Sequence, residues 1–586
     1  MPMPVLGKEP SANPDHSPSL PSPPLALPPI QVTQTATPPF FPAGVMSPFK
    51  KISERFAALR REDSTKPLER LALSPFTASA SEILLVQQTV DDICVEIPFL
   101  NIPQFLDILS RPDAIGIPDA WWQGLMNALI ASALVYKTHT RSIRDVAPYS
   151  WAFFRNAYAV LPELIIQGDT IGATQAVMAM ALFTRQSADI RTTARLLGMA
   201  VRMHHTAGLN VTTLAGQPIL SDEDENQRRL ALTAFVLDME IVVNTGLAPA
   251  HADRVANGLL PLPTMPATSS AWYDSVFQAR VALAQIQVRL AASLASPNQA
   301  DLIALESELE AWSLRVPSEI RPNSHYRDEA SAPQTALDLP VAILHLVYYN
   351  CLCMVAWALV RHVTDQMLKS GLPEATDCFA LSERTGHHRN VARVTARATI
   401  RTMSRFPVRL YADLWRVVAY PLAASIALLA VVCKEPDHPD AQTDLSLLSW
   451  FAHFLDRMVR EEGCDLEKMR DGVSKFEMVA SDAVAAALGS VMPVNPSLWP
   501  LTLASGQTGK AMATLMTCSS YVPMYLAQAL IGNLSNRDTK NAKKLAEILE
   551  IPWADNGYGP FVPDSLIPVS YGFAFQSGGS SIGREN

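Results

Sequence analysis

A twenty-residue apolar stretch at positions 341–360 constrains the fold of this chain more than any other feature. It follows Pro340, contains no charged residue and approaches the length of a membrane-spanning helix. It also holds His345, Asn350, two tyrosines and two cysteines, which suit a protein interior better than lipid. We therefore predict a buried core helix here and not a membrane span. The composition agrees, because 48% hydrophobic and only 18% charged residues favour a large apolar interior.

Runs with helical spacing follow one another through the middle of the chain. The motif Ser79-Ala80-Ser81-Glu82 fits a capping box before the first run, at 83–97. Alanine, leucine and methionine fill these runs, and we find no convincing series of alternating strands. The sequence therefore predicts an all-α fold, a large irregular helical array without a regular repeat. The other predicted helices span residues 119–136, 150–167, 171–184, 190–207, 223–244, 272–294, 302–313, 341–368, 388–403, 410–433, 445–461 and 467–488.

The two ends of the chain differ in composition from the helical region, 79–490. Residues 1–48 hold 14 of the 45 prolines, and we expect this Pro/Ser-rich segment to be disordered. Residues 49–78 form a basic amphipathic linker, in which 49–61 combine an apolar stripe with lysines and arginines. A nuclear-import patch, the remains of a DNA-contacting linker and a solvated helix on the core all stay open. The C-terminal extension, 491–586, is expected to be partly disordered, with one helical stretch at 537–549.

Charge and cysteine usage limit the classes of function. A net charge of -9 gives no support to direct DNA binding, which relies on basic surfaces. The start of the chain shows no secretory signal, and the odd number of cysteines at irregular spacing indicates no disulfide framework. We therefore expect a reducing, intracellular compartment. No pair has zinc-site spacing, so no metal site is predicted from the cysteines, which stand at Cys94, Cys351, Cys353, Cys378, Cys433, Cys464 and Cys518.

Short motifs occur in a recognisable order between residues 97 and 263. The first is Pro-Phe-Leu-Asn-Ile-Pro-Gln-Phe-Leu at 98–106, and Leu-Leu-Gly-Met-Ala-Val-Arg follows at 196–202. The most specific piece is Glu225-x-x-Arg228-Arg229-Leu230, with Phe-x-Leu-Asp at 235–238, Gly246 before Pro249, and Leu-Pro-Leu-Pro at 260–263. Farther on, Leu-His-x-x-Tyr-Tyr occupies 344–349. In order and spacing, this region resembles the middle homology region, or fungal-specific transcription factor domain, of fungal zinc-cluster transcription factors.

The resemblance covers roughly residues 79–488 and implies a helical regulatory domain. Members of that family also carry a DNA-binding module of six cysteines holding two zinc ions, whereas this sequence has no cysteine before Cys94. The chain is therefore expected to lack that module, either because it acts without one or because the cysteines are encoded upstream. Two residues depart from the family pattern: Leu232 stands at a usual aromatic, and Leu247 at a usual arginine. Independently of any family, Glu225 can pair with Arg228 or Arg229 on one helix.

Several patterns suggest chemistry but have simpler explanations. Asp91, Asp92 and Glu96 could hold a divalent ion in an all-α enzyme, but a companion motif on a later helix is missing. Residues 504–511 nearly match a phosphate-binding loop, yet Ala511 lacks the hydroxyl and no buried strand precedes it. The pairs His204-His205 and His387-His388 point about 100° apart on a helix and are assigned to packing or the surface. We therefore predict no catalytic, cofactor-binding or metal residues.

The predicted function is transcription regulation in the nucleus, without enzymatic activity. The resemblance implies pathway-specific control, as of a secondary-metabolite gene cluster, through other transcription factors or co-regulators. Contact with DNA is expected to be indirect, and no membrane contact is predicted. A small-molecule effector could occupy a core pocket near His345 and Asn350, although a filled core is the simpler prediction. The alternatives are a metal-dependent helical enzyme and a helical scaffold without a role in transcription.

Overall fold

The described residues confirm the all-α prediction. The computed structural model describes residues 80–111, 119–166, 170–186, 190–206, 221–251, 271–295, 297–322, 337–369, 376–406, 408, 411–464 and 466–489. Within these ranges the chain forms helices and no strand. The predictions for 1–48, 49–78, 491–586 and 537–549, and for the phosphate-loop-like motif at 504–511, lie outside the described residues.

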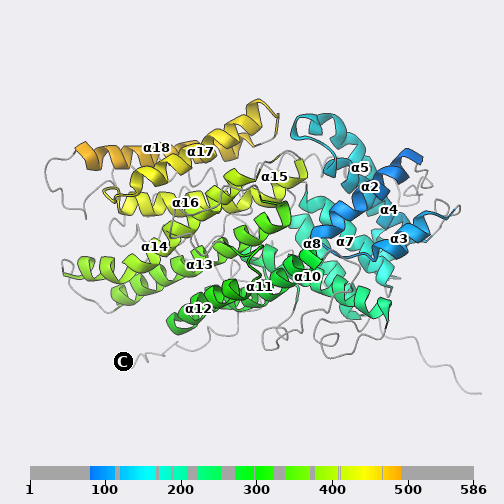
Figure 1. Cartoon of the computed structure of the whole chain (residues 1–586), viewed down its shortest axis with the longest axis horizontal. Coiled ribbons are helices and arrows are strands. Elements are labelled where there is room, and N and C mark those ends of the chain that lie inside the picture. The colour runs from blue at the N-terminus through cyan, green and yellow to red at the C-terminus, as the bar shows by residue number, and fades with distance from the viewer. Residues whose placement is uncertain are drawn as a thin grey trace, which may run out of the picture. The chain divides into compact units, whose positions relative to one another are not determined.

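The first half of the described chain, drawn in blue to cyan-green in Figure 1, consists mainly of helices that pack around α4 and α7. α4 contacts α2, α5 and α7, and α7 contacts α8. The bounds of these elements are α2 Ala80–Glu96, α3 Ile102–Leu109, α4 Ala120–Tyr136, η3 Thr140–Ser142, α5 Ile143–Ala159, α6 Leu161–Ile166, α7 Ile171–Arg185, α8 Ile190–Thr206 and α10 Asp222–Thr245.

The second half is organised around α13, which contacts α11, α12, α14 and α16. In Figure 1, α13, α14 and α16 lie side by side, and α17 and α18 pair along the outer side of α16. The bounds here are α11 Ala271–Ala295, α12 Gln299–Arg315, α13 Leu339–Lys369, α14 Thr376–Arg405, α15 Tyr411–Val417, α16 Ala419–Lys434, α17 Ala441–Arg460 and α18 Glu467–Gly489.

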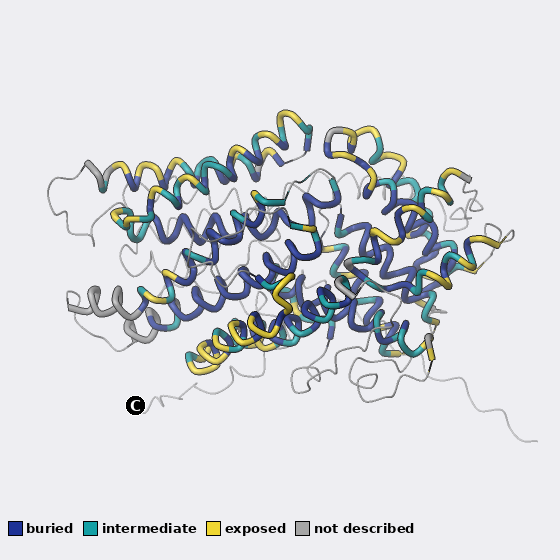
Figure 2. Tube along the Cα trace, in the orientation of Figure 1, coloured by how far each residue is buried: buried dark blue, intermediate teal, exposed yellow. Residues whose placement is uncertain are grey.

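The apolar stretch at 341–360 lies in α13 and is enclosed by other helices. Its window Leu339–Val360 has the length and hydropathy of a membrane span, yet it is entirely buried within the fold. Figure 2 shows α13 and α16 in dark blue along most of their length, whereas α12, α17 and α18 carry exposed residues on their outer sides. These observations confirm the predicted buried helix.

Two helices that the periodicity predicted as continuous are broken, and proline explains both breaks. The predicted helix 150–167 is divided at Val160, because Pro162 is accommodated only in the first turn of a new helix, α6. The predicted helix 410–433 is divided at Val418 into α15 and α16, which meet at a bend of 40°. Pro421 lies in the first turn of α16, where its missing N–H costs least.

Other helix starts also differ from the prediction, and α5 begins at Ile143, seven residues before the predicted start at 150. α3 was not predicted as a helix, but Asn101 caps it by accepting a hydrogen bond from the Gln104 backbone N–H at 3.3 Å, and Pro103 fits its first turn. α14 begins at Thr376, about three turns before the predicted start at 388. Polar residues and Gly386 obscured the helical pattern there, because the pattern is recognised by its apolar residues.

Two helical glycines give a matched test of the packing. A Cβ on Gly172 of α7 would lie 2.6 Å from the Trp121 ring of α4, whereas a Cβ on Gly386 of α14 would meet nothing within 4 Å. We expect Gly386→Ala to stabilise the fold by about 1 kcal/mol through helix propensity. Gly172→Ala should destabilise it by about 1–2 kcal/mol, because Trp121 must shift. Urea unfolding followed by circular dichroism measures both, and equal shifts would contradict the packing of α4 on α7.

Candidate functional site

The family-like motif at 225–238 lies on α10, a helix that is capped and paired as the sequence indicated. Ser221 Oγ accepts a hydrogen bond from the Asp224 backbone N–H at 3.2 Å and so begins the helix. Arg229 Nε donates to Glu225 Oε1 at 3.0 Å, one turn away. The predicted local ion pair is therefore confirmed, with Arg229 as the partner.

The apolar residues of α10 face two groups of buried side chains. Phe235 packs in a small cluster with α11 residues such as Phe277, while the rest join the main core of the domain. Leu232, the first departure from the family pattern, is buried in the small cluster, and Leu247, the second, packs against the main core. Both departures thus serve packing here. Four apolar residues of the motif helix are all buried: Leu230, Phe235, Leu237 and Ile241.

Asp238 holds the loop that follows α10. Its Oδ2 accepts hydrogen bonds from the backbone N–H groups of Ala250 at 2.8 Å and His251 at 3.0 Å, and lies 2.9 Å from His251 Nδ1. The chain can fold back to reach it because Gly246 ends α10 in the left-handed region, with φ of 69°. The Phe-x-Leu-Asp motif and the glycine after it therefore hold the loop at 246–251 against α10, and this arrangement is here called the clasp.

The motif pieces that lie apart in the sequence meet around the segment at 98–106. Gln175 Nε2 of α7 donates to the Phe99 carbonyl at 3.0 Å, and Thr233 Oγ1 of α10 donates to the Pro98 carbonyl at 3.4 Å. Phe99 itself is fully buried. These side chains satisfy carbonyl groups that would otherwise be buried without partners.

A charged group in the interior joins three helices near the C-terminal end of α10. Glu240 Oε2 lies 3.2 Å from Arg185 Nη2 of α7, and Glu240 Oε1 lies 2.5 Å from Arg280 Nη2 of α11. The Glu240 and Arg280 side chains are 7% and 3% exposed, so the pairing takes place away from solvent. Removing one partner would leave buried charge uncompensated, which makes the relative positions of these helices hard to change.

Polar contacts continue from α10 into the second half. Asn350 Nδ2 of α13 donates to Asn244 Oδ1 of α10 at 3.0 Å, and Asn244 Nδ2 lies 3.5 Å from the Tyr420 hydroxyl of α16. His345 of α13 is also engaged, since its Nε2 lies 3.1 Å from the Ile320 carbonyl. The core pocket near His345 and Asn350 stays a prediction. A pocket of about 520 Å³ lies elsewhere, between the start of α12 and His362 of α13.

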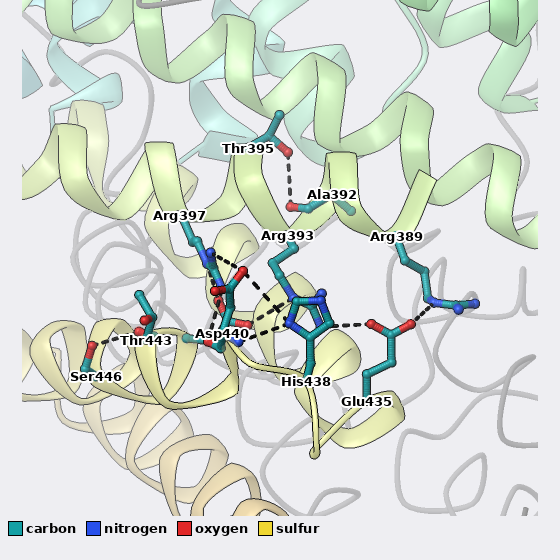
Figure 3. Close-up of polar contacts among 11 residues, drawn as sticks. Arg389, Ala392, Arg393, Thr395, Arg397, Glu435, His438, Asp440, Thr443 and Ser446 are labelled. Carbon is teal, nitrogen blue, oxygen red and sulfur yellow. Dashed lines mark hydrogen bonds and ion pairs between the residues drawn. The ribbon is translucent and has the colours of Figure 1, made fainter. Parts of the chain in front are cut away.

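Three arginines spaced four residues apart on α14 form a second buried charged network, here called the arginine ladder (Figure 3). Arg389 and Arg393 bind opposite oxygens of Glu435 at 2.7 and 2.9 Å. Arg393 and Arg397 also bind Asp444, at 3.1 and 2.5 Å. Arg397 reaches Asp440 at 3.2 Å as well. Three guanidinium groups thus face three carboxylates and hold α14 against the segment that joins α16 to α17 and against the first turn of α17.

The ladder favours the charged forms of Glu435 and Arg397, whereas burial raises the pKa of Asp444 in spite of its contacts with Arg397 and Arg393. Burial alone would raise the pKa of Glu435, but the charges of Arg389 and Arg393 and their hydrogen bonds outweigh it and lower that pKa. Burial alone would also lower the pKa of Arg397, yet its hydrogen bond and attraction to Asp444, with Asp440, raise it. The sequence signal for the ladder was the four-residue spacing of the arginines, which places them on one helix face. Their acidic partners could not be identified from the sequence.

The Asp91-Asp92 pair shows no metal-binding arrangement among the described residues. Both side chains are exposed, and Lys137 Nζ of α4 lies 2.6 Å from Asp92 Oδ2. The candidate metal cluster that the described residues form contains neither aspartate. Cys351 and Cys353 are both buried, and burial raises the pKa of each thiol to about 12.

The two histidine pairs have different surroundings. His204 is buried, neither of its ring nitrogens has a hydrogen-bond partner among the described residues, and burial, with the neighbouring His205 and His251, lowers its pKa to about 4. The prediction of a packing residue suits it. At the other pair, Glu306 of α12 approaches both histidines, and His388 Nδ1 lies 3.9 Å from Glu306 Oε2.

The ladder predicts a large difference between two similar substitutions. Asp444 is fully buried, whereas the Asp440 side chain is 47% exposed. We expect Asp444→Asn to lower the free energy of unfolding by about 3 kcal/mol, because it leaves buried arginines undercompensated. Asp440→Asn should cost less than about 1 kcal/mol. Urea denaturation of both variants checks this, and a small loss for Asp444→Asn would refute the buried pairing.

Buried neutral histidines predict a loss of stability in acid. Burial lowers the pKa of His204 and of His345 to about 4, below the ordinary value near 6.5 that each has in the unfolded chain. The unfolded state therefore takes up protons first as the pH falls, and stability present above pH 6.5 is lost progressively toward pH 4. Between pH 7 and pH 5, each histidine should remove about 2 kcal/mol.

Single substitutions separate the histidine contributions. His204→Leu should flatten the decline in unfolding free energy between pH 7 and pH 5, because it removes a histidine whose pKa burial lowers. Chemical denaturation at a series of pH values measures the slope. An identical slope in wild type and His204→Leu would show that His204 is not held neutral.

Part of this chain matches the model of a known protein family. Residues 86–310 match the model of the fungal specific transcription factor domain. That range contains the motifs at 98–106, 196–202, 225–238 and 260–263, together with the Glu240 contacts to α7 and α11. The match supports the order of motifs on which the resemblance was based.

Curated proteins with similar sequences are named as fungal regulators. The ABC-transporter-regulating transcription factors of Aspergillus fumigatus and Aspergillus oryzae are each 23% identical over 432 residues, covering 70% of this chain and 48% of the relative. The fusaridione A cluster transcription factor of Fusarium heterosporum is 23% identical over 378 residues, covering 61% of this chain and 68% of the relative.

The similarities cover part of this chain and part of each relative. The chain spans about half the length of the Aspergillus relatives. No solved structure matches the chain. The family model and the curated relatives agree with each other and with the motifs on α10. Residues 86–310 of this chain are thus similar to the fungal specific transcription factor domain, and the curated proteins that resemble the chain are named as fungal transcription factors.

Proposed function

We propose that this protein regulates transcription in the nucleus, that its helical domain acts through partner proteins, and that it is not an enzyme. The observation that carries the proposal is the family match at 86–310, whose signature helix α10 is buried and clasped to its own loop. The signature residues of this helix are used in packing and buried pairing. A buried helix of this kind can pass a displacement from one part of the domain to another. Its side chains are poorly placed to bind a substrate.

The buried contacts of α10 support a role in relaying a signal. α10 is linked to α7 and α11 through Glu240, and to α13 and α16 through Asn244. A partner or ligand that displaced one of these helices would strain contacts in both halves of the domain. The domain therefore has the connections that a regulatory relay requires, and a small-molecule effector is one agent that could use them.

Partners and target genes are proposed from charge and kinship. The net charge of -9 favours protein partners over direct phosphate contacts, so we propose that this chain reaches DNA through other transcription factors or co-regulators. One relative is named for a secondary-metabolite cluster and others for ABC-transporter regulation. We propose pathway-specific control of the same kind, with a secondary-metabolite gene cluster as the favoured target.

Gene deletion combined with localisation of a tagged full-length chain tests the proposal. Deletion should change the transcripts of a limited gene set, and the tagged chain should be nuclear and occupy promoters of that set. Unchanged transcripts, or a strictly cytoplasmic chain, would contradict regulation, and the latter would favour the scaffold alternative. Promoter occupancy should also disappear when zinc-cluster relatives are removed, and its persistence would refute indirect DNA contact.

A separate control addresses the enzyme alternative. Asp91→Asn combined with Asp92→Asn removes the candidate metal carboxylates from the exposed side of α2. Because both residues lie on the surface, the double variant should fold and restore the wild-type transcripts in the deletion strain. Failure to restore them, with normal folding and nuclear localisation, would favour the enzyme.

A further inference from the structure

Three side chains that can bind metal ions meet where α12 lies near α14. Glu306 comes from α12, and His387 and His388 come from α14. Their ligand atoms all lie within 4.8 Å of one another. The two imidazole rings have centroids 5.3 Å apart and are inclined by 71°, and His388 Nδ1 lies 3.9 Å from Glu306 Oε2. The three groups therefore converge on one point from two helices.

His387 and His388 are neighbours on one helix, α14. Neighbouring side chains on a helix diverge by about 100°, so two of them make a poor site. Glu306 supplies the missing ligand from a second helix. In a tetrahedral zinc site, with bonds of about 2.0–2.1 Å, neighbouring ligand atoms lie roughly 3.4 Å apart. A contraction of at most about 1.4 Å, through changes of side-chain torsion angles, would bring the observed cluster to that spacing.

His388 has a buried ring nitrogen that a metal ion could bind. Its Nδ1 is buried and neither accepts nor donates a hydrogen bond among the described residues. A buried polar atom without a partner is costly, and a bound ion would satisfy it. His387 is exposed and therefore able to turn toward an incoming ion.

We propose that Glu306, His387 and His388 form a binding site for Zn²⁺. Two imidazole nitrogens and one carboxylate oxygen are a ligand set that zinc accepts, with water or a partner's side chain in the fourth position. The bound ion would join α12 to α14 and would make the contact between these two helices dependent on metal supply. The proposal does not rest on the function in transcription, so either can fail without the other.

Titration of the chelator-treated full-length chain with ZnCl₂ tests the site. Isothermal titration calorimetry should detect one Zn²⁺ more per chain in wild type than in His387→Ala, His388→Ala or Glu306→Gln. Each of these variants should bind that ion at least about tenfold more weakly, since a direct ligand is lost. Saturating Zn²⁺ should raise the Tm of wild type and not that of the variants, because the ion binds the folded state.

Matched variants guard against other zinc ligands and against misfolding. His453→Ala removes an exposed histidine of α17 outside the cluster and should leave the extra Zn²⁺ and the Tm shift intact. His387 is itself exposed, so His387→Ala is expected to keep the wild-type circular dichroism spectrum even if His388→Ala does not. Wild-type zinc binding in folded His387→Ala, or equal losses in His453→Ala, would overturn the proposal.

Discussion

The enclosure of α13 is the constraint on which the other helices depend. An apolar helix that exposes no face must be covered on every side, and α11, α12, α14 and α16 provide that cover. Polar groups carried inward with it must then find partners inside the protein. His345 contacts the Ile320 carbonyl, and Asn350 binds Asn244 of α10. Satisfying these groups links the second half of the domain to the signature helix.

Buried charges then limit how the surrounding helices can be arranged. Hydrophobic burial is not directional, so the apolar core alone would allow small shifts of one helix against another. Arg393 of the ladder binds both Glu435 and Asp444, and Glu240 binds arginines from two other helices. A shift that separated any of these pairs would leave a charge without a partner in the apolar interior. The two networks therefore favour one relative placement of their helices over nearby alternatives.

The sequence predicted features that depend on residues close together in the chain, and it did not predict contacts between residues far apart in it. The α13 helix and the Glu225–Arg229 pair were predictable because both follow from residues within a few turns of each other. The breaks at Pro162 and Pro421 were visible as prolines but were outweighed by the apolar periodicity around them. The partners of Asp238, and the approach of Glu306 to His387 and His388, could not be predicted, because they depend on loops and helix packing.

The departures from the family pattern show why motif likeness and residue role must be argued separately. Leu232 and Leu247 replace residues that the resemblance would have made aromatic and basic, yet both pack into apolar clusters. The residues that keep their type, Asp238 and Gly246, form the clasp after α10. What α10 retains is therefore its backbone course and its buried pairing. A regulatory domain can preserve this internal geometry while its contacts with partners change, because the geometry depends on few residues and they face inward.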